Sequence, residues 1–443
     1  MSASKTDAYR ISGGKPLIGE INCLGAKNLS TKAMVAAMLG NSPTTLTNVP
    51  AIGDVDITAE MLSSIGMKIG RSDSTSLELD PLSMNTSEVP MPHSGSNRIP
   101  ILLLGPLLHR YGKATIPVLG GCNIGARNVD FHIEAIRKFG GIVDGTDKGY
   151  EASCKKKLKG TQITLPYPSV GATETCLFLG VLATGRTVIS NAAIEPEIYE
   201  LITMLRSMGA VIFTSQGRDI IIEGVKELRG THLQILGDRI EAASWAALAC
   251  ASKGDITVKG IRPDTLGNFL SFFQQVGGGF DLIDENAIRF YRREDLRSTV
   301  IETDVYPGFS TDWQQPFAIL LTQADGVSVI HETVYENRFG YLKTLNKLGA
   351  RTQPTTHCLG SLPCRYKEKG FEHSVLISGP SPLIASSEPI DIPDLRAGLA
   401  YLIAAAIAKG ESLITGIHYI ERGYGDIVPR LKAMNLDIRQ VKI

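Results

Sequence analysis

The chain has 443 residues, of which 43% are hydrophobic and 20% charged, and its 45 basic residues balance 45 acidic ones to a formal net charge of zero. This balance argues against a nucleic-acid-binding protein, because such proteins normally carry a basic excess, and the length predicts two large domains. The N-terminus lacks the apolar core of a signal peptide, and no stretch approaches the roughly twenty apolar residues that span a bilayer. We therefore expect a cytoplasmic protein without a membrane partner.

A repeat of about seventy residues recurs six times along the chain. Each copy has an apolar helical run, a glycine, a short β-branched run that predicts a strand, a second helical run and a second stop. Glycine or asparagine at that stop suits the left-handed C-cap of a helix. The first glycines are Gly40, Gly112, Gly185, Gly254, Gly326 and Gly410, and the second stops are Gly66, Gly140, Gly209, Gly277, Gly349 and Asn435.

The first helix of each repeat begins with a polar or glycine-containing segment. Four of these segments carry a cation near the same position, and the unpaired N–H groups and dipole of a helix N-terminus already favour anions. The sequence therefore predicts an anionic ligand. The six segments are residues 25–28, 97–100, 169–172, 238–241, 310–313 and 394–397.

The two helices of a repeat differ in their apolar pattern. Residues 176–183 and 399–407, in first helices, are apolar nearly all round, which predicts burial on every side. Residues 198–205, in a second helix, are more amphipathic and are expected to cover the outside. Six βαβαββ-like repeats of this kind predict two compact α/β domains.

Seven widely spread cysteines suggest free thiols in a chain without a secretion signal. His357, Cys358 and Cys364 together suggest a metal, but the C-x5-C spacing differs from that of a zinc knuckle and no second ligand pair is nearby in the chain. We therefore expect no metal. Cys358 and Cys364 lie in an insertion, roughly residues 355–374, indicated by the 84 residues that separate Gly326 from Gly410.

Seven ordered motifs resemble those of the enolpyruvyl transferase family, over essentially the whole chain. The cysteine-containing motif favours the branch that acts on UDP-N-acetylglucosamine over the shikimate branch. The motifs are residues 25–28 (GAKN), 120–127 (GGCNIGAR), 169–173 (SVGAT), 195–198 (EPEI), 309–312 (FSTD), 336–339 (ENRF) and 394–397 (DLRA).

The resemblance implies an α/β fold, a two-lobed inside-out α/β barrel with three repeats in each lobe. Residues 26–236 would form the lobe that carries the cysteine loop. Residues 1–25 and 237–443 would form the second lobe, with chain crossings near Gly25 and Gly237 and an active site in the cleft between the lobes.

The implied reaction transfers the enolpyruvyl group of phosphoenolpyruvate to the 3-hydroxyl of a UDP-sugar and releases phosphate, without a metal or organic cofactor. Phosphoenolpyruvate carries a carboxylate and a phosphate, and the planar fork of arginine pairs with both. By resemblance Lys27, Arg127 and Arg396 hold phosphoenolpyruvate, and Arg98 and Arg338 complete the positive shell. Surface ion pairing is the alternative for each of them.

Addition and elimination need a general acid and a general base at the same carbon. Cys122 follows two glycines in an electropositive loop, where a thiol becomes reactive. By resemblance Cys122 is the acid and the target of fosfomycin, Asp312 is the base, and Lys27 is catalytic as well as substrate-binding. The alternatives are a buried, inert cysteine and an aspartate that only caps its helix.

The resemblance also implies contacts to the acceptor. Asn28 would hydrogen-bond the sugar, and the backbone N–H groups of Ser169, Val170 and Gly171 would bind the diphosphate. Glu195 and Glu197 suit either a first helical turn or a role in the cleft. Further substrate-binding residues are Asn128, Val129, Asp130, Phe131, which can stack on a pyrimidine, and Val334.

The chain departs from the family pattern at Asn128, Phe131, Leu102 and Trp313, and most of these departures are near the expected acceptor site. Two alternatives stay open. One is a paralogue that uses another uridine nucleotide or nucleotide sugar in specialised metabolism. The other is a catalytically silent binding protein that kept the fold. Oligomeric state does not follow from the sequence.

Overall fold

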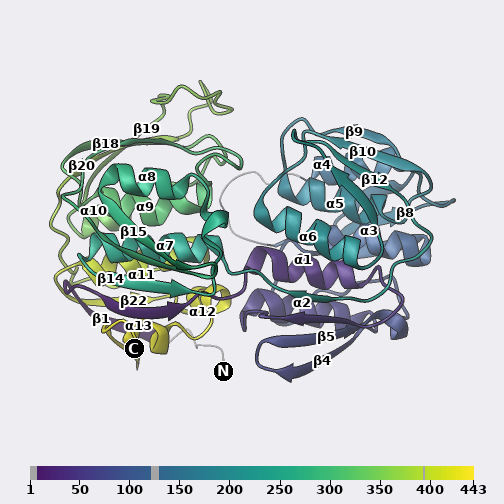
Figure 1. Ribbon diagram of the computed structural model, residues 1–443, viewed down its shortest axis with the longest axis horizontal. Coiled ribbons are helices and arrows are strands. Elements are labelled where there is room, and N and C mark those ends of the chain that lie inside the picture. Colours follow the sequence, from purple (N-terminus) through teal and green to yellow (C-terminus); the bar gives the residue numbers. More distant parts are fainter. Residues whose placement is uncertain (1–6, 121–128, 393–394) are drawn as a thin grey trace. The chain divides into compact units, whose positions relative to one another are not determined.

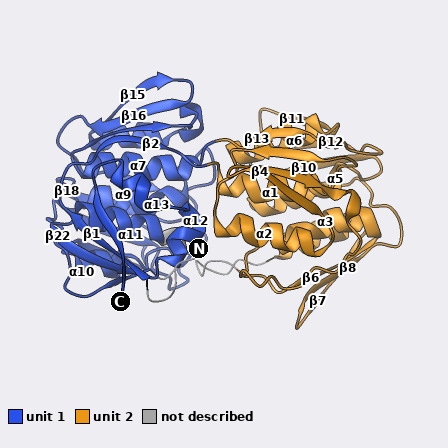
Figure 2. Cartoon of the chain, turned by 90° about the horizontal axis from the view of Figure 1, so that it is seen from below, with its two compact units in different colours: residues 1–24, 122–126, 237–443 blue, residues 25–121, 127–236 orange. Residues whose placement is uncertain are grey.

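The computed structural model describes residues 7–120, 129–392 and 395–443, the side chains of residues 395–397 excepted. The chain divides into two compact units, coloured separately in Figure 2. Unit 1 comprises residues 1–24, 122–126 and 237–443, and unit 2 comprises residues 25–121 and 127–236. No helix in the described part of the chain is both long and apolar enough to cross a membrane.

The first helix predicted for each repeat is present and buried on most sides. In α5, for example, nine consecutive residues from Ala172 to Gly180 are buried. The fifth first helix begins as a 3-10 turn, η3 (Thr311–Trp313), before continuing as α9. These helices are α1 (Lys27–Ala37), α3 (Pro100–Tyr111), α5 (Val170–Gly180), α7 (Arg239–Ala251), α9 (Gln314–Leu321) and α11 (Leu395–Ile407).

The second helices cover the outside of the units and have exposed faces. They are α2 (Gly53–Ser64), α4 (Asp130–Lys138), α6 (Pro196–Ser207), α8 (Phe269–Val276), α10 (Leu342–Lys347) and the pair α12 (His418–Tyr424) and α13 (Ile427–Lys432). Short 3-10 turns, η1 (Pro81–Ser83) and η2 (Pro263–Leu266), complete the helical elements.

Unit 2 contains three sheets. In β13-β3-β5-β4 the first pair is parallel and the others are antiparallel, and β9-β10-β12-β11 repeats this order. The third sheet is β6-β8-β7, which is antiparallel throughout. The strands are β3 (Thr44–Thr47), β4 (Lys68–Asp73), β5 (Ser76–Asp80), β6 (Lys113–Pro117), β7 (Ile142–Thr146), β8 (Gly149–Ser153), β9 (Gln162–Thr164), β10 (Arg186–Ser190), β11 (Val211–Thr214), β12 (Ile220–Glu223) and β13 (His232–Gln234).

Unit 1 contains three four-stranded sheets, β2-β14-β16-β15, β17-β18-β20-β19 and β21-β22-β1-β23. In each, the first pair is parallel and the rest are antiparallel. The strands are β1 (Asp7–Gly13), β2 (Ile18–Asn22), β14 (Asp255–Lys259), β15 (Gly278–Asp284), β16 (Ala287–Arg292), β17 (Val300–Glu302), β18 (Gly326–His331), β19 (Arg351–Thr355), β20 (Ser374–Gly379), β21 (Ile390–Asp391), β22 (Gly410–Thr415) and β23 (Asp437–Lys442).

The core of each unit forms where its first helices meet. Helices α7, α9 and α11 contact one another in unit 1, and α3 contacts α1 and α5 in unit 2. Figure 1 shows the sheets arranged around these helices within each unit. Strand residues alternate accordingly, as in β10, where Thr187 and Ile189 are buried and their neighbours are not. An alternating pattern is typical of a sheet that is covered on one face.

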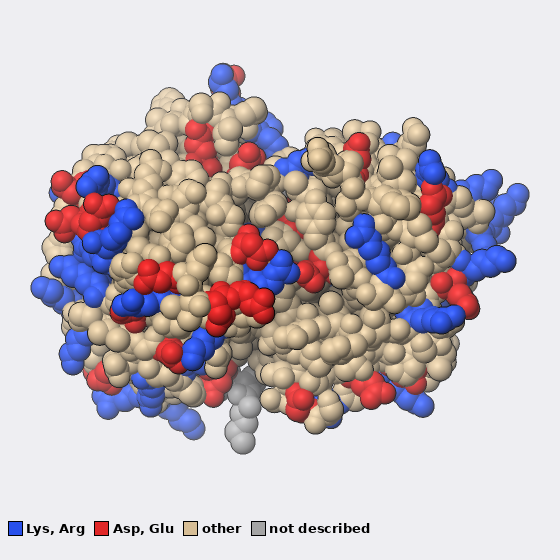
Figure 3. Space-filling view, in the orientation of Figure 1, with Lys and Arg blue, Asp and Glu red and all other residues tan. Residues whose placement is uncertain are grey.

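All six residues predicted as second stops have positive φ, from 63° at Asn435 to 111° at Gly277. Left-handed backbone at these positions explains the choice of residue, since a Cβ is unfavourable there for most amino acids. Surface charges of both signs are interspersed on the face seen in Figure 3, in agreement with the zero net charge.

Gly209 tests the role of these stops. Its φ is 108° and no heavy atom lies within 4 Å of a Cβ built there, so Gly209→Ala changes backbone strain alone. We expect it to lower the free energy of unfolding by about 1 kcal/mol. Gly217→Ala is the control, because Gly217 lies outside the left-handed region and its Cβ would make an ordinary contact with Ser215. Equal urea midpoints for the two variants would contradict the prediction.

Candidate active site

The starts of three helices converge in unit 2 around His132 of α4. A Cβ at Gly171, on α5, would lie 3.0 Å from His132 Cε1, so glycine lets the imidazole lie against that helix start. His132 Nδ1 is 2.7 Å from Thr175 Oγ1. Burial, together with the nearby charge of Arg98 before α3, lowers the pKa of His132 to about 4. His132 was not predicted as a site residue; it lies against Gly171 and feels the charge of Arg98.

The N-terminus of α5 has the geometry of an anion site. Ser169 is its N-cap and accepts a hydrogen bond from the N–H of Ala172 at 3.4 Å. Helix geometry leaves the N–H groups of Val170 and Gly171 without intrahelical acceptors. Because α4 contacts α5, its first residues lie at the same end: Val129 is buried, Asp130 exposed and Phe131 half-buried.

Lys27 and Asn28 form the first turn of α1, and both are partly buried. Lys27 Nζ lies 3.1 Å from Asp54 Oδ2 of α2, and the two side chains are 21% and 14% exposed. The ammonium group is therefore held by a carboxylate in a semi-buried position, where an ion pair is less screened than on the open surface.

Asp312 and Arg338 form a buried ion pair in unit 1. Arg338 Nη2 lies 2.9 Å from Asp312 Oδ1 and donates a second hydrogen bond to the carbonyl of Thr311 at 2.8 Å. Arg338 Nε and Nη1 are buried and have no hydrogen-bond partner among the described residues. Ser310, and not Asp312, caps the turn through its side chain, so the cap-only interpretation of Asp312 is not what the structure shows.

Glu332 connects the two segments that form this ion pair, and sequence reasoning missed it. Its carboxylate is fully buried and accepts hydrogen bonds from Thr311 Oγ1 at 2.9 Å and Gln314 Nε2 at 3.1 Å. The other oxygen accepts from the N–H groups of Val334 at 2.8 Å and Tyr335 at 3.0 Å. Burial raises the pKa of Glu332, an effect that the charge of Arg338 and these hydrogen bonds oppose. One carboxylate thus joins the two segments that carry Asp312 and Arg338.

A second buried acid, Glu174, lies on α5. Desolvation raises its pKa to about 7, with further increases from the charges of Glu195 and Glu197 at the start of α6, whereas Lys32 on α1 lowers it. Glu195 is the N-cap residue of α6 but makes no side-chain cap hydrogen bond, and Glu197 is buried. These acids therefore belong to an electrostatic cluster inside unit 2.

Two departures from the family pattern are core positions. Trp313 is fully buried and packs edge-on against Phe269 and Phe309, with centroids 5.4 and 5.5 Å apart, and Leu102 is buried within α3. Both side chains therefore contribute to core packing. Arg239, at the start of α7, has its guanidinium 5.3 Å from the Trp313 ring centroid. In the sequence, Arg239 was indicated only by its position at the start of a first helix; the structure shows that it is buried.

Four predicted site residues lie wholly or partly outside the described residues. Cys122, Arg127 and Asn128 are outside, and so is the side chain of Arg396, whose backbone belongs to α11. The structure thus gathers Arg98, residues 129–131 and residues 169–171 in unit 2, and Asp312, Val334 and Arg338 in unit 1.

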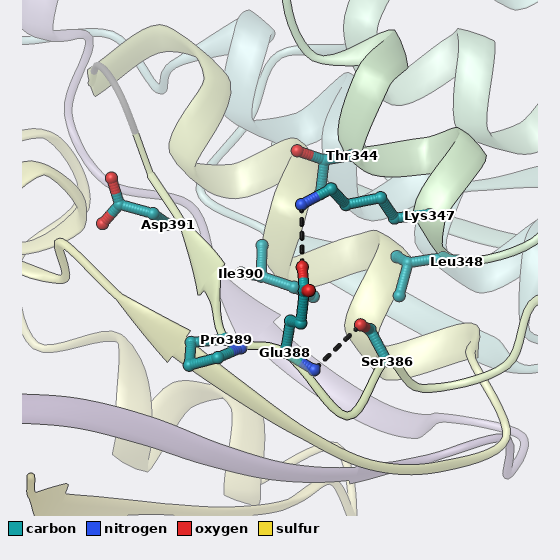
Figure 4. A pocket seen from close by; sticks show the side chains of 8 residues that line it. All are labelled: Thr344, Lys347, Leu348, Ser386, Glu388, Pro389, Ile390 and Asp391. Carbon is teal, nitrogen blue, oxygen red and sulfur yellow. Dashed lines mark hydrogen bonds and ion pairs between the residues drawn. The ribbon is translucent and has the colours of Figure 1, made fainter.

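A pocket of about 150 Å³ in unit 1 is lined by none of the predicted residues (Figure 4). An ion pair between Lys347 Nζ and Glu388 Oε2, 3.0 Å long, borders it, and both side chains are more than 60% exposed. Exposed pairs of this kind contribute little, so this pocket does not compete with the residues above as the active site.

The fold is that of known enolpyruvyl transferases. The enolpyruvyl transferase NikO from Streptomyces tendae superposes with a TM-score of 0.84 over 99% of both chains at 21% identity. EPSP synthase from Acinetobacter baumannii gives 0.73 over 99% of this chain and 100% of that one at 18% identity. Residues 11–431 match the profile of the EPSP synthase (3-phosphoshikimate 1-carboxyvinyltransferase) family, and the chain belongs to this family of transferases.

Curated relatives within the family carry a more specific name. UDP-N-acetylglucosamine 1-carboxyvinyltransferase of Protochlamydia amoebophila is 46% identical over 98% of this chain and 95% of its own length. The enzyme of the same name from Chlamydia pneumoniae is 44% identical, over 97% and 94% respectively. These full-length matches confirm the resemblance on which the predicted chemistry rests.

Glu332→Gln tests the bracing role. The substitution removes the buried charge that faces Arg338, and it puts an N–H donor at one of two oxygen positions that now accept hydrogen bonds. We expect the free energy of unfolding to fall by about 1 to 3 kcal/mol, and kcat/KM by on the order of ten- to a hundredfold, because Asp312 and Arg338 shift. The exposed Glu388→Gln is the control. A variant that melts and turns over like the parent would refute the role.

Glu174 makes stability depend on pH in a defined direction. Its folded pKa lies above the unfolded value, so the folded state binds the extra proton, and stability is lost as pH rises from about 4.5 to 7. Glu174→Gln removes the buried charge. We expect it to raise the free energy of unfolding at pH 8 by about 1 to 3 kcal/mol and to leave it nearly unchanged at pH 5. Urea titrations at both pH values measure this, and destabilisation at pH 8 would be the contrary result.

Proposed function

We propose that this chain transfers the enolpyruvyl group of phosphoenolpyruvate to the 3-hydroxyl of UDP-N-acetylglucosamine and releases phosphate, the first committed step of peptidoglycan precursor synthesis. The observation that carries the proposal is the full-length identity of 46% and 44% to two enzymes named for this activity. The buried ion pair of Asp312 and Arg338 also supports the proposal, because it places a carboxylate and a cation together for the reaction.

Cations account for phosphoenolpyruvate binding in this proposal. Lys27, Arg127 and Arg396 bind its phosphate and carboxylate, and Arg98 extends the positive shell. Arg338 lends support, because two of its buried donors, Nε and Nη1, lack partners among the described residues and an unpaired buried donor is costly. An anion within reach of these donors removes that cost.

The acid and base are assigned by the same proposal. Asp312 removes the proton of the acceptor hydroxyl while the hydroxyl oxygen forms a bond to C2 of phosphoenolpyruvate. Cys122 gives a proton to C3. Elimination then removes a proton from C3, restores the double bond and expels phosphate. Arg338, through its bond to Asp312, orients the carboxylate for the first step.

The acceptor is assigned to groups at helix starts. The N–H groups at residues 169–171 bind the diphosphate, in keeping with the preference of helix N-termini for phosphate, and Asn28 hydrogen-bonds the sugar. Residues 128–131 and Val334 complete the binding surface, with the half-buried Phe131 stacking on uracil.

The finer architecture belongs to the same proposal. We infer that each of the six sheets, with its first and second helix, is one copy of the repeat, and that three copies per lobe form an inside-out barrel. The strand order that five of the six sheets share supports this inference. Residues 26–236 and residues 1–25 with 237–443 are the inferred lobes.

Phosphate release from phosphoenolpyruvate tests the proposal. The parent chain is expected to release phosphate with UDP-N-acetylglucosamine and far more slowly with UDP-glucose or UDP-N-acetylgalactosamine. Cys122→Ala and Asp312→Asn should each lower kcat by about 10²- to 10⁴-fold, while ligand binding, followed by calorimetry, persists. Cys154→Ala, at a half-buried cysteine outside the motifs, is the control.

The outcomes separate the alternatives. Release only with another nucleotide sugar would replace the acceptor and keep the enzyme class. Binding of UDP-N-acetylglucosamine without release of phosphate under any condition would identify a catalytically silent protein and end the proposal.

A further inference from the structure

Four side chains of types that can ligate a metal lie close together in unit 1, and none of them is assigned to catalysis. They are His331, Cys358, Cys364 and His373, and their ligand atoms all lie within 4.8 Å of one another. His331 ends β18. Both cysteines and His373 lie in the loop of residues 356–373, which connects β19 to β20, and His373 is the last residue before β20. The sequence-based expectation of no metal looked for a second ligand pair close in the chain, whereas the fold supplies it from His331 at the end of β18 and His373 next to β20. His357 is not a member.

The hydrogen bonds of His373 orient its ring for a ligand at Nε2. Its Nδ1 lies 2.7 Å from the carbonyl oxygen of Phe371, which can only accept, so Nδ1 carries the proton. The neutral ring then presents a lone pair at Nε2, which is 3.2 Å from Cys358 Sγ. An Nδ1–H bond to a backbone carbonyl is the usual outer contact of a metal-bound histidine.

His331 contributes a buried ring nitrogen to the cluster. Its side chain is fully buried, and its Nδ1 lies 2.7 Å from Ser374 Oγ. Its Nε2 has no hydrogen-bond partner among the described residues. A buried nitrogen without a partner is costly, and this one lies among a second imidazole and two sulfur atoms. A cluster held by hydrogen bonds alone would leave that nitrogen unsatisfied.

The loop is built to bring its cysteines to the histidines. A Cβ at Gly360 would collide with the Glu302 carboxylate and approach His331 Cδ2 to 2.7 Å, so only glycine permits this approach. Glu302 in turn accepts hydrogen bonds from the N–H groups of Ser361 at 2.9 Å and Leu362 at 2.8 Å. The N–H of Tyr366 points to Cys364 Sγ at 3.4 Å, the kind of donor that supports a thiolate.

We propose that these four residues form a structural Zn²⁺ site. Two sulfur and two nitrogen ligands in a tetrahedron are a preferred zinc set, with bonds of roughly 2.0 to 2.3 Å that place ligand atoms about 3.5 Å apart. The ligand atoms of the observed cluster, all within 4.8 Å of one another, are close to this spacing. Binding deprotonates both thiols and releases their two protons to solvent. Four protein ligands leave no open position, so the ion fixes the loop and performs no chemistry.

The need for such an ion follows from the loop itself. Residues 356–373 contain no helix or strand, and most of their side chains are exposed. A segment of this length without regular structure has little apolar burial to offset its ordering entropy. A metal that joins it to β18 and β20 supplies that stabilisation.

Metal content of the purified full-length chain tests the proposal. After incubation with excess Zn²⁺ and passage over a chelating resin, we expect one tightly bound zinc per chain by mass spectrometry of the metal. Replacement by Co²⁺ should give the visible absorption and thiolate charge-transfer bands of a tetrahedral Cys₂His₂ site. Cys358→Ser and Cys364→Ser should each lower zinc retention at least tenfold, whereas His357→Asn and Cys154→Ser should retain it.

A second readout follows the loop and does not depend on enzymatic activity. Removal of zinc with a chelator should speed trypsin cleavage after the exposed Lys367 and Lys369 by at least tenfold. A parent chain that retains no zinc, or cysteine variants that retain it fully, would overturn the site. A disulfide between Cys358 and Cys364 in freshly purified protein, detected by alkylation without reductant, would overturn it too.

Discussion

Burial of the first helix of each repeat is the constraint on which the rest of the structure depends. A helix that is apolar on nearly every side can satisfy its backbone along its length but not in its first turn, where N–H groups lack acceptors. That turn must therefore be polar, capped or bound to an anion. Ser169, the Lys27 turn and the Thr311–Trp313 turn are three solutions to this one requirement. Polar and charged side chains are concentrated in the first turns because the remainder of each helix is buried among apolar residues.

Buried charges in this chain share a common support. Glu332 offers four acceptor interactions to two separate segments, and Arg338 ties one of those segments to Asp312. In unit 2, the buried His132 lies against the glycine of α5, and burial together with the nearby charge of Arg98 lowers its pKa to about 4. Asp312 and Arg338, which are assigned to the reaction, are thus held by Glu332, a neighbour that need not contact the substrate.

Periodic features were predictable and long-range partners were not. The strand runs, the buried first helices and the left-handed second stops each follow from local spacing, and the structure places all of them as expected. Glu332 and His132 gave no signal, because a buried acid or imidazole is recognised only by the groups that surround it. The ligand set of Cys358 and Cys364 was missed for the same reason: His331 lies across a sheet and not along the chain. Trp313, noted in the sequence only as a departure from the family pattern, is a buried core residue.

Val334 makes hydrogen bonds both to Glu332, next to the predicted active site, and to the inserted loop, residues 356–373. Its N–H binds Glu332, while its carbonyl oxygen accepts hydrogen bonds from Tyr366, at 2.6 Å, and from Arg365, both in the loop. Surface insertions usually vary independently of the site chemistry, but here the loop cannot open without breaking bonds to that residue. The loop and the Glu332 segment therefore form one cooperative opening unit, whose amides are expected to exchange with solvent together.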